Sequence, residues 1–326
     1  MPNRRVVHPA LALLLAVVAT AAFAATPAPP SPTPAAAGPA RPDLVRIVRL
    51  KLSAADLASA EAWTEDWKRD VGADATWLDA RGWLARGAWM LGEADRALAF
   101  AREVRAAIPE PRPEFLVPLG AALEVEGRIV AERQGPAAGA RFFREAEGLS
   151  GDVAFRSRMW KNVNRLELVG REAPEIGVAD QVGAPVKPLA GRRGRPVLLY
   201  FWSHRCFDCT ASAPTLARLR ERFGARGLDI VAPLRLSATA RDGAAMTPEV
   251  EKAEIATTLV EKYAELGGLD VPVDTATMVR YGASATPTFV LVDGAGIVRL
   301  YAPTRLTLDA LATAIEPLLP PAAAKS

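Results

Sequence analysis

The stretch RPVLLYFWSHRCFDCT, residues 195–210, joins an apolar run to the only two cysteines of the chain, Cys206 and Cys209. The run at 195–202 predicts a buried β-strand, because branched and aromatic residues follow one another there. The segment TASAPTLARLRERFG, residues 210–224, predicts a helix. The cysteines therefore lie where a strand passes into a helix. Random placement of two cysteines gives their spacing in roughly 0.6% of cases, so chance explains it poorly.

Strands and helices alternate from about residue 168 onward. After the cysteines we expect a second strand over 228–236 and a long helix over 249–267. A hairpin over 288–301, which turns at Asp293–Gly296, and a last helix over 307–318 follow. This order predicts an α/β sandwich with an antiparallel hairpin at one edge of its sheet.

The position of the cysteines favours disulfide exchange. Backbone N–H groups and the helix dipole at the start of a helix stabilise a thiolate at Cys206, which would act as the attacking nucleophile. Cys209, one turn later, would attack the resulting mixed disulfide and release the product. We expect its sulfur to be more buried and less reactive than that of Cys206.

Other uses of the cysteines remain open. Zinc or an iron–sulfur cluster needs further ligands, and beyond His8 near the N-terminus His204 is the only other histidine. Copper(I) held by Cys206, Cys209 and His204 is a more open alternative, because soft thiolates suit that ion. A static disulfide would close almost no loop and so would stabilise the fold little.

The N-terminus predicts export. Two arginines precede the apolar run 10–24, which ends in the triplet Ala22-Phe23-Ala24, so we expect a signal peptide over 1–24; an uncleaved anchor is the alternative. Residues 25–42 form a Pro/Ala-rich linker and 321–326 a disordered tail. Removal of residues 1–24 takes away two arginines and no acids, so the formal net charge falls from +3 to +1, which gives no reason to expect nucleic acid as a partner.

Residues 43–166 predict an all-α domain, either helical hairpins or a bundle, and 167–320 form the second domain of an α+β chain. Ser53 is the expected cap of a helix that contains Trp63 and Trp67. Six of the seven tryptophans lie in this first domain, and at helical spacing they predict core positions, with a binding surface as the alternative.

Part of this domain weakly resembles a tetratricopeptide repeat. The stretch 84–109 has Leu84, Gly92, Ala97 and Pro109 at matching positions, and a fainter copy lies 43 residues later, where Gly135, Ala140 and Phe143 stand opposite Gly92, Ala97 and Phe100. The large aromatics of such repeats are missing at Arg81 and Ala88. The resemblance implies an array of helical hairpins.

The C-terminal half resembles the thioredoxin superfamily, most closely its exported TlpA/ResA-type branch. The resemblance covers about 168–320 and rests on REAPEIGVAD (171–180), the strand before the Cys-x-x-C motif, Pro214 and YGASATPTFVLVDGAGIV (281–298). It implies a thioredoxin-like α/β sandwich in which Thr286–Pro287 is a cis-proline turn beside the cysteines. It also implies that the Thr286 backbone pairs with an extended substrate strand.

The chain departs from that family beside each cysteine. Arg205 precedes Cys206 where thioredoxins have tryptophan, and its positive charge favours a thiolate and substrate binding; Asp208 precedes Cys209 and opposes that effect. Tyr200 replaces the buried acid of thioredoxins, and Ser212 replaces a glutamate of ResA-type proteins. Asp208, Glu221 and water are the open alternatives for the proton acceptor of Cys209.

The segment SATARDGAAMTPEVEK, residues 237–252, is longer than a tight connection needs. It either shapes a substrate groove or forms a solvated surface loop.

These observations predict an exported, periplasmic or otherwise extracytoplasmic thiol–disulfide oxidoreductase with no bound cofactor. A reductase of partner proteins is favoured, and a membrane-bound thiol protein would supply its electrons. The helical domain would dock a partner or position the substrate. The alternative is a copper(I)-binding or protein-adaptor module on the same fold. A peroxidase of the peroxiredoxin type is disfavoured, because the Pro-x-x-x-Thr-x-x-Cys pattern is absent around Cys206.

Overall fold

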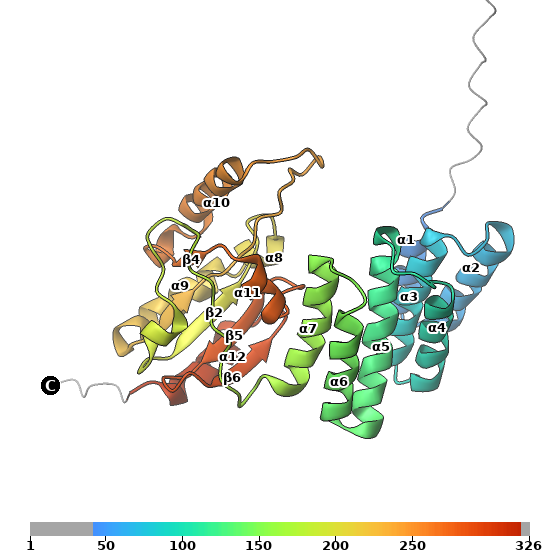
Figure 1. Ribbon diagram of the computed structural model, residues 1–326, viewed down its shortest axis with the longest axis horizontal. Coiled ribbons are helices and arrows are strands. Elements are labelled where there is room, and N and C mark those ends of the chain that lie inside the picture. The colour runs from blue at the N-terminus through green and yellow to red at the C-terminus, as the bar shows by residue number, and fades with distance from the viewer. Residues whose placement is uncertain (1–41, 321–326) are drawn as a thin grey trace, which may run out of the picture. The chain divides into compact units, whose positions relative to one another are not determined.

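The computed structural model describes residues 42–320 (Figure 1). The predicted signal peptide (1–24), the linker 25–42 except for Pro42, and the tail 321–326 lie outside the described residues. No helix among the described residues has both the length and the apolar character needed to cross a membrane.

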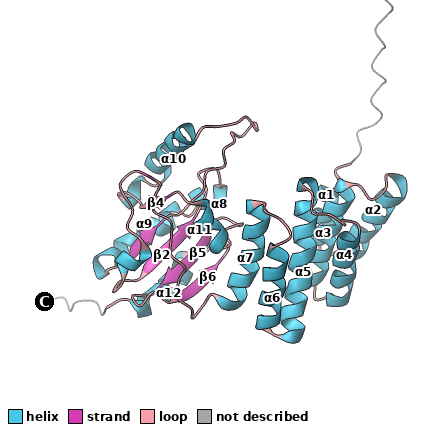
Figure 2. Ribbon diagram, in the orientation of Figure 1, coloured by secondary structure: helices cyan, strands magenta, loops and turns pink. Residues whose placement is uncertain are grey.

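The first part of the described chain is helical (Figure 2). Its elements are α1 (Leu44–Ser53), α2 (Leu57–Asp70), α3 (Ala75–Met90), α4 (Ala94–Ala106), η1 (Pro113–Phe115), α5 (Leu116–Gln134), α6 (Pro136–Glu147) and α7 (Val153–Glu167). Aspartates Asp43, Asp56, Asp74 and Asp152 cap α1, α2, α3 and α7 by accepting backbone N–H groups. The predicted Ser53 cap is wrong: Ser53 ends α1, and Asp56 caps the helix that contains Trp63 and Trp67.

The tryptophans pack into this region to different degrees. Trp77 is fully buried, and Trp67, Trp83, Trp89 and Trp160 pack partly against the same core. Trp63 is 39% exposed, so the predicted core role does not hold for it.

The two predicted copies of the hairpin have equivalent residues in equivalent roles. Gly92 and Gly135 adopt φ of 83° and 91° at the turns before α4 and α6, a conformation that favours glycine. Ala97 and Ala140 are both fully buried, and Phe100 and Phe143 are both core residues. This match supports the repeat-like interpretation.

The second part contains a four-stranded sheet in the order β3-β2-β5-β6. Strand β2 (Val197–Phe201) pairs parallel with β3 (Asp229–Val231) and antiparallel with β5 (Thr288–Val292), which pairs antiparallel with β6 (Val298–Ala302). Two short strands, β1 (Gln181–Val182) and β4 (Val271–Pro272), form a separate antiparallel pair. The helices are α8 (Phe207–Thr210), α9 (Ala213–Phe223), α10 (Pro248–Lys262), α11 (Thr275–Arg280) and α12 (Leu308–Ile315), with 3-10 turns η2 (Leu189–Arg192), η3 (Gly224–Arg226), η4 (Ala264–Leu266) and η5 (Glu316–Leu318).

Both faces of β2 are buried, which is why its sequence is apolar throughout. Leu198 and Tyr200 join a core that includes residues of α9 and α12, whereas Leu199 and Phe201 join a core with Tyr281 on the opposite face. The predicted sandwich with an edge hairpin is therefore confirmed.

The helix predicted over 210–224 is α9, which begins three residues later than predicted. Helix α8 ends at Thr210 and α9 begins at Ala213, with Pro214 in its first turn. Proline lacks a backbone N–H and cannot continue the hydrogen bonds of the preceding turn.

Helix α7 packs against α11 and the turn that follows it. The Asn164 amide donates to the Arg280 carbonyl oxygen at 2.9 Å. Gly282, with φ of 62°, lies so close to α7 that a Cβ atom there would come within 2.2 Å of the Lys161 backbone nitrogen. This contact brings the helical region next to the turn that leads to Thr286.

Candidate active site

Cys206 ends the loop after β2 and is the N-cap residue of α8. Its Sγ atom accepts a hydrogen bond from the Cys209 backbone N–H at 3.3 Å. This bond holds the sulfur at the first turn of α8. Both cysteines are free, and Cys206 is only partly buried, so its sulfur is the one a partner can reach.

Cys209 lies one turn later and is fully buried. Burial, with a further contribution from the hydrogen bond to Cys206, raises the pKa of the Cys209 thiol to about 12. Ordinary cysteine thiols have a pKa near 8.5. Cys209 therefore remains protonated at neutral pH. This agrees with the expectation that its sulfur is more buried and less reactive than that of Cys206.

The Thr286–Pro287 peptide bond is cis, as the family resemblance implied. The Cys206 thiol donates to the Thr286 carbonyl oxygen at 3.3 Å. The strand-helix junction at Cys206 and the loop before β5, 80 residues later in the chain, thus meet at one sulfur atom.

Tyr200, on strand β2, contacts Cys209. Its hydroxyl donates to the Cys209 carbonyl oxygen at 2.8 Å and lies 3.1 Å from the Tyr263 hydroxyl. Burial raises the pKa of both phenols, so both stay protonated. The sequence alone did not indicate Tyr263, because it lies 63 residues from Tyr200 at the end of α10.

The remaining alternatives for the proton acceptor lie at the surface. Asp208 and Glu221 are both exposed, and the residue that replaces the family's glutamate, Ser212, donates its hydroxyl to the Asp208 carbonyl oxygen. Within the described residues, no cluster of three or more His, Cys, Asp or Glu side chains forms a metal site.

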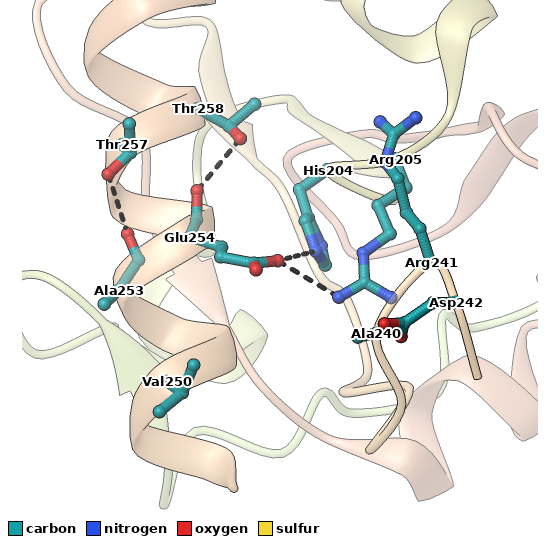
Figure 3. Close-up of a pocket in the computed structure, with 10 residues that line it drawn as sticks. All are labelled: His204, Arg205, Ala240, Arg241, Asp242, Val250, Ala253, Glu254, Thr257 and Thr258. Carbon is teal, nitrogen blue, oxygen red and sulfur yellow. Dashed lines mark hydrogen bonds and ion pairs between the residues drawn. The ribbon is translucent and has the colours of Figure 1, made fainter. Parts of the chain in front are cut away.

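Arg205 is directed at α10, where Glu254 accepts from its guanidinium at 3.0 Å (Figure 3). Ser237 Oγ at 3.3 Å and the Thr239 carbonyl oxygen accept from the same side chain. The positive charge that the sequence placed beside Cys206 is thus partly neutralised by Glu254.

His204 also faces Glu254, with 3.5 Å between His204 Nε2 and Glu254 Oε2 (Figure 3). Burial, and then the charge of Arg205, lower the pKa of His204. The side chain is therefore neutral at pH 7 and points toward α10.

His204, Arg205 and residues of α10 line a cavity of about 770 Å³ (Figure 3). Residues Ala240, Arg241 and Asp242 of the long loop also line it. The loop is fixed by Glu251, a fully buried carboxylate that accepts the backbone N–H groups of Ser237 and Ala238 and the Ser237 hydroxyl at 2.8–3.0 Å. The segment 237–252 therefore lines a cavity together with Arg205, the residue before Cys206, while residues 241–245 of the same segment are exposed.

We expect Glu251→Gln to destabilise the protein by about 1–3 kcal/mol, because the glutamine amide would place donors against the donors of Ser237 and Ala238. Burial raises the pKa of Glu251, but these hydrogen bonds outweigh burial and lower it. The stabilisation is thus present above the unfolded pKa of about 4.3 and is lost as pH falls below it. Urea unfolding at pH 7 and pH 3.5 measures the difference.

The matched control for this prediction is Glu261→Gln, which changes an exposed carboxylate near the end of the same helix. It should leave stability unchanged at both pH values. Equal stability of Glu251→Gln and the wild type at pH 7 would show that the loop is not held by this carboxylate.

Comparison with known proteins bears on the second part of the chain. Residues 169–301 match the AhpC/TSA family. This part of the chain is a thioredoxin-like domain. Its match ends at β6, and the helical region lies outside it.

The thioredoxin-like domain is similar to the proteins named thiol-disulfide oxidoreductase ResA of Bacillus thuringiensis (strain Al Hakam) and Bacillus anthracis. Each is 27% identical over 134 residues, which is 40% of this chain and 66% of the relative. The chain thus spans slightly less than two thirds of the length of these curated relatives.

Solved structures with a similar chain include a thiol:disulfide interchange protein of Chlorobium tepidum TLS, 15% identical, covering 46% of this chain and 96% of that one, with a TM-score of 0.36. Another is a secreted disulfide oxidoreductase of Mycobacterium tuberculosis, which is 20% identical. The match covers 42% of this chain and 90% of that chain, with a TM-score of 0.33.

Proposed function

We propose that this protein is an exported thiol–disulfide oxidoreductase that reduces disulfides of partner proteins through Cys206 and Cys209. The observation that supports it most is the asymmetry of the pair: an accessible sulfur beside two backbone groups, and a buried thiol one turn away. The names of the ResA relatives support the same chemistry.

In the first step, the Cys206 thiolate attacks one sulfur of the substrate disulfide. A Cys206–substrate disulfide forms, the substrate S–S bond breaks, and one substrate sulfur leaves as a thiolate. Cys209 then loses its proton and attacks Cys206 Sγ. The Cys206–Cys209 disulfide forms and the second substrate thiolate leaves, so that two electrons pass from the protein to its partner.

The surface around Cys206 suits a protein partner. Phe207, between the two cysteines, is 81% exposed and offers an apolar contact. The Thr286 backbone is the proposed pairing site for an extended substrate strand, next to the sulfur. Arg205, the residue before Cys206, is held by Glu254 and lines the cavity along α10.

Each turnover leaves Cys206 and Cys209 oxidised, so a dithiol donor must return two electrons. If residues 1–24 direct export, that donor is a membrane-bound thiol protein. A Phe-Asp dipeptide between the cysteines, without histidine, favours the reducing direction.

A single-turnover experiment tests the proposal. The reduced protein is mixed with an equal amount of a disulfide-containing protein, and thiols are alkylated and counted by mass. We expect one Cys206–Cys209 disulfide for each substrate disulfide that is lost. Loss of substrate disulfides without oxidation of this pair would contradict the proposal.

A further inference from the structure

Alternate helices of the N-terminal region lie side by side: α1 contacts α3, α3 contacts α5, and α5 contacts α7 (Figure 1). Three hollows of about 350, 210 and 380 Å³ lie along these four helices, and Arg86 lines all three. We call this surface the arginine face, after the cations that line the hollows: Arg49, Arg86, Arg128, Arg158, Lys161 and Arg165.

Acidic side chains are far fewer than basic ones on the arginine face. Only Glu124 and Asp152 line the hollows, and Asp152 is occupied as the cap of α7. Glu124 is 2% exposed and bonds Lys161 at 2.8 Å, Arg158 at 3.0 Å and Arg128 at 3.3 Å. One buried carboxylate is therefore shared by three cations.

The other three cations, Arg49, Arg86 and Arg165, form no ion pair within residues 42–320. Besides Glu124, the carboxyl group of Asp79 also interacts electrostatically with Arg158 and Arg49. Burial lowers the pKa of Arg86, and the nearby Arg158, Arg128 and Arg49 lower it further, while Glu124 opposes the change. An added anion would relieve this repulsion.

Tryptophans hold several of these guanidinium groups in place. Arg49 and Arg86 stack on Trp83 at 4.7 and 4.8 Å, and Arg128 stacks on Trp89 at 4.5 Å. Stacking orders a guanidinium group but leaves its charge in place and its N–H edge free for a carboxylate. The buried Arg128 Nε atom has no hydrogen-bond partner among the described residues.

The third hollow extends the arginine face toward the cysteines. It is lined by Arg158 and Lys161 of α7 and also by Ser284 and Ala285. These two residues directly precede Thr286, whose carbonyl oxygen accepts from the Cys206 thiol.

We propose that the arginine face binds an extended acidic segment of a partner protein, whose carboxylates pair with Arg49, Arg86 and Arg165. A guanidinium fork and a carboxylate match in geometry and charge. Separate hollows fit successive side chains of a peptide better than a flat bilayer. That the partner is also the redox substrate rests on the proposed function and follows from the nearness of Ser284 and Ala285 to Cys206.

Fluorescence anisotropy tests the proposal with a labelled peptide of about ten residues that alternates glutamate and serine. We expect it to bind the purified protein, and binding to weaken as salt is raised. The variant Arg49→Gln/Arg165→Gln should bind roughly tenfold more weakly. Both residues are exposed, so the fold should be retained.

The matched control is Arg102→Gln/Arg141→Gln, two exposed arginines on α4 and α6, which should bind like the wild type. Equal binding by the Arg49/Arg165 variant, equal binding of a lysine–serine peptide, or binding of anionic phospholipid vesicles but not of the acidic peptide would each overturn the proposal. Cys206→Ser should bind the peptide normally, so this test and the thiol chemistry succeed or fail separately.

Discussion

Replacing the accessible cysteine, Cys206→Ser, should reduce disulfide exchange with a protein substrate to the uncatalysed rate. A serine hydroxyl at this position cannot form the mixed disulfide, and Cys209 is fully buried and cannot replace it. The measurement is the loss of substrate disulfide per minute, with dithiothreitol as the electron source.

The fold of this variant should be intact, because serine is smaller than cysteine and Cys206 is only partly buried. Circular dichroism and thermal unfolding supply that control. Exchange that persists in a folded Cys206→Ser protein would place the nucleophile elsewhere and remove the basis of the proposed function.

The second variant, Cys209→Ser, should stop the reaction half-way and accumulate a Cys206–substrate disulfide. Cys206 keeps its position and can attack, but no second thiol remains to release the substrate. The adduct should appear as a mass equal to the sum of the two proteins, and dithiothreitol should remove it.

The pH dependence of release provides a second measure of Cys209. Its pKa, raised to about 12 by burial, means that less thiolate is available at pH 7 than for an ordinary thiol. In the wild type, release of the mixed disulfide should therefore accelerate as pH rises from 7 to 10 without a plateau near about 8.5. A plateau there would show an ordinary, exposed thiol; rapid turnover by Cys209→Ser would show that Cys209 is not needed.

The strand, the cysteine pair and the cis-proline turn could be predicted because each has a local signal. An uninterrupted apolar run indicates β2, two cysteines at fixed spacing follow it, and Thr286–Pro287 lies in a stretch that resembles the thioredoxin superfamily. The break between α8 and α9 also has a local cause, because Pro214 is the second residue of α9.

Contacts between distant segments could not be predicted in the same way. The charge of Arg205 was expected to act on Cys206, the next residue in the sequence, but Arg205 forms an ion pair with Glu254, 49 residues later. The partner of Tyr200 is 63 residues away, and the loop is held by Glu251 from within a helix. Periodicity indicates which face of an element is buried, but not which residue of another element meets it.

The equilibrium reduction potential of the Cys206–Cys209 pair tests the central claim most directly. The purified protein is equilibrated in thiol/disulfide buffers of known ratio, and the fraction of alkylated cysteine is read by mass. We predict a single two-electron transition at a potential clearly more negative than about −200 mV, as a reductase requires. A value near about −120 mV, or no disulfide between Cys206 and Cys209 at any buffer ratio, would contradict the account.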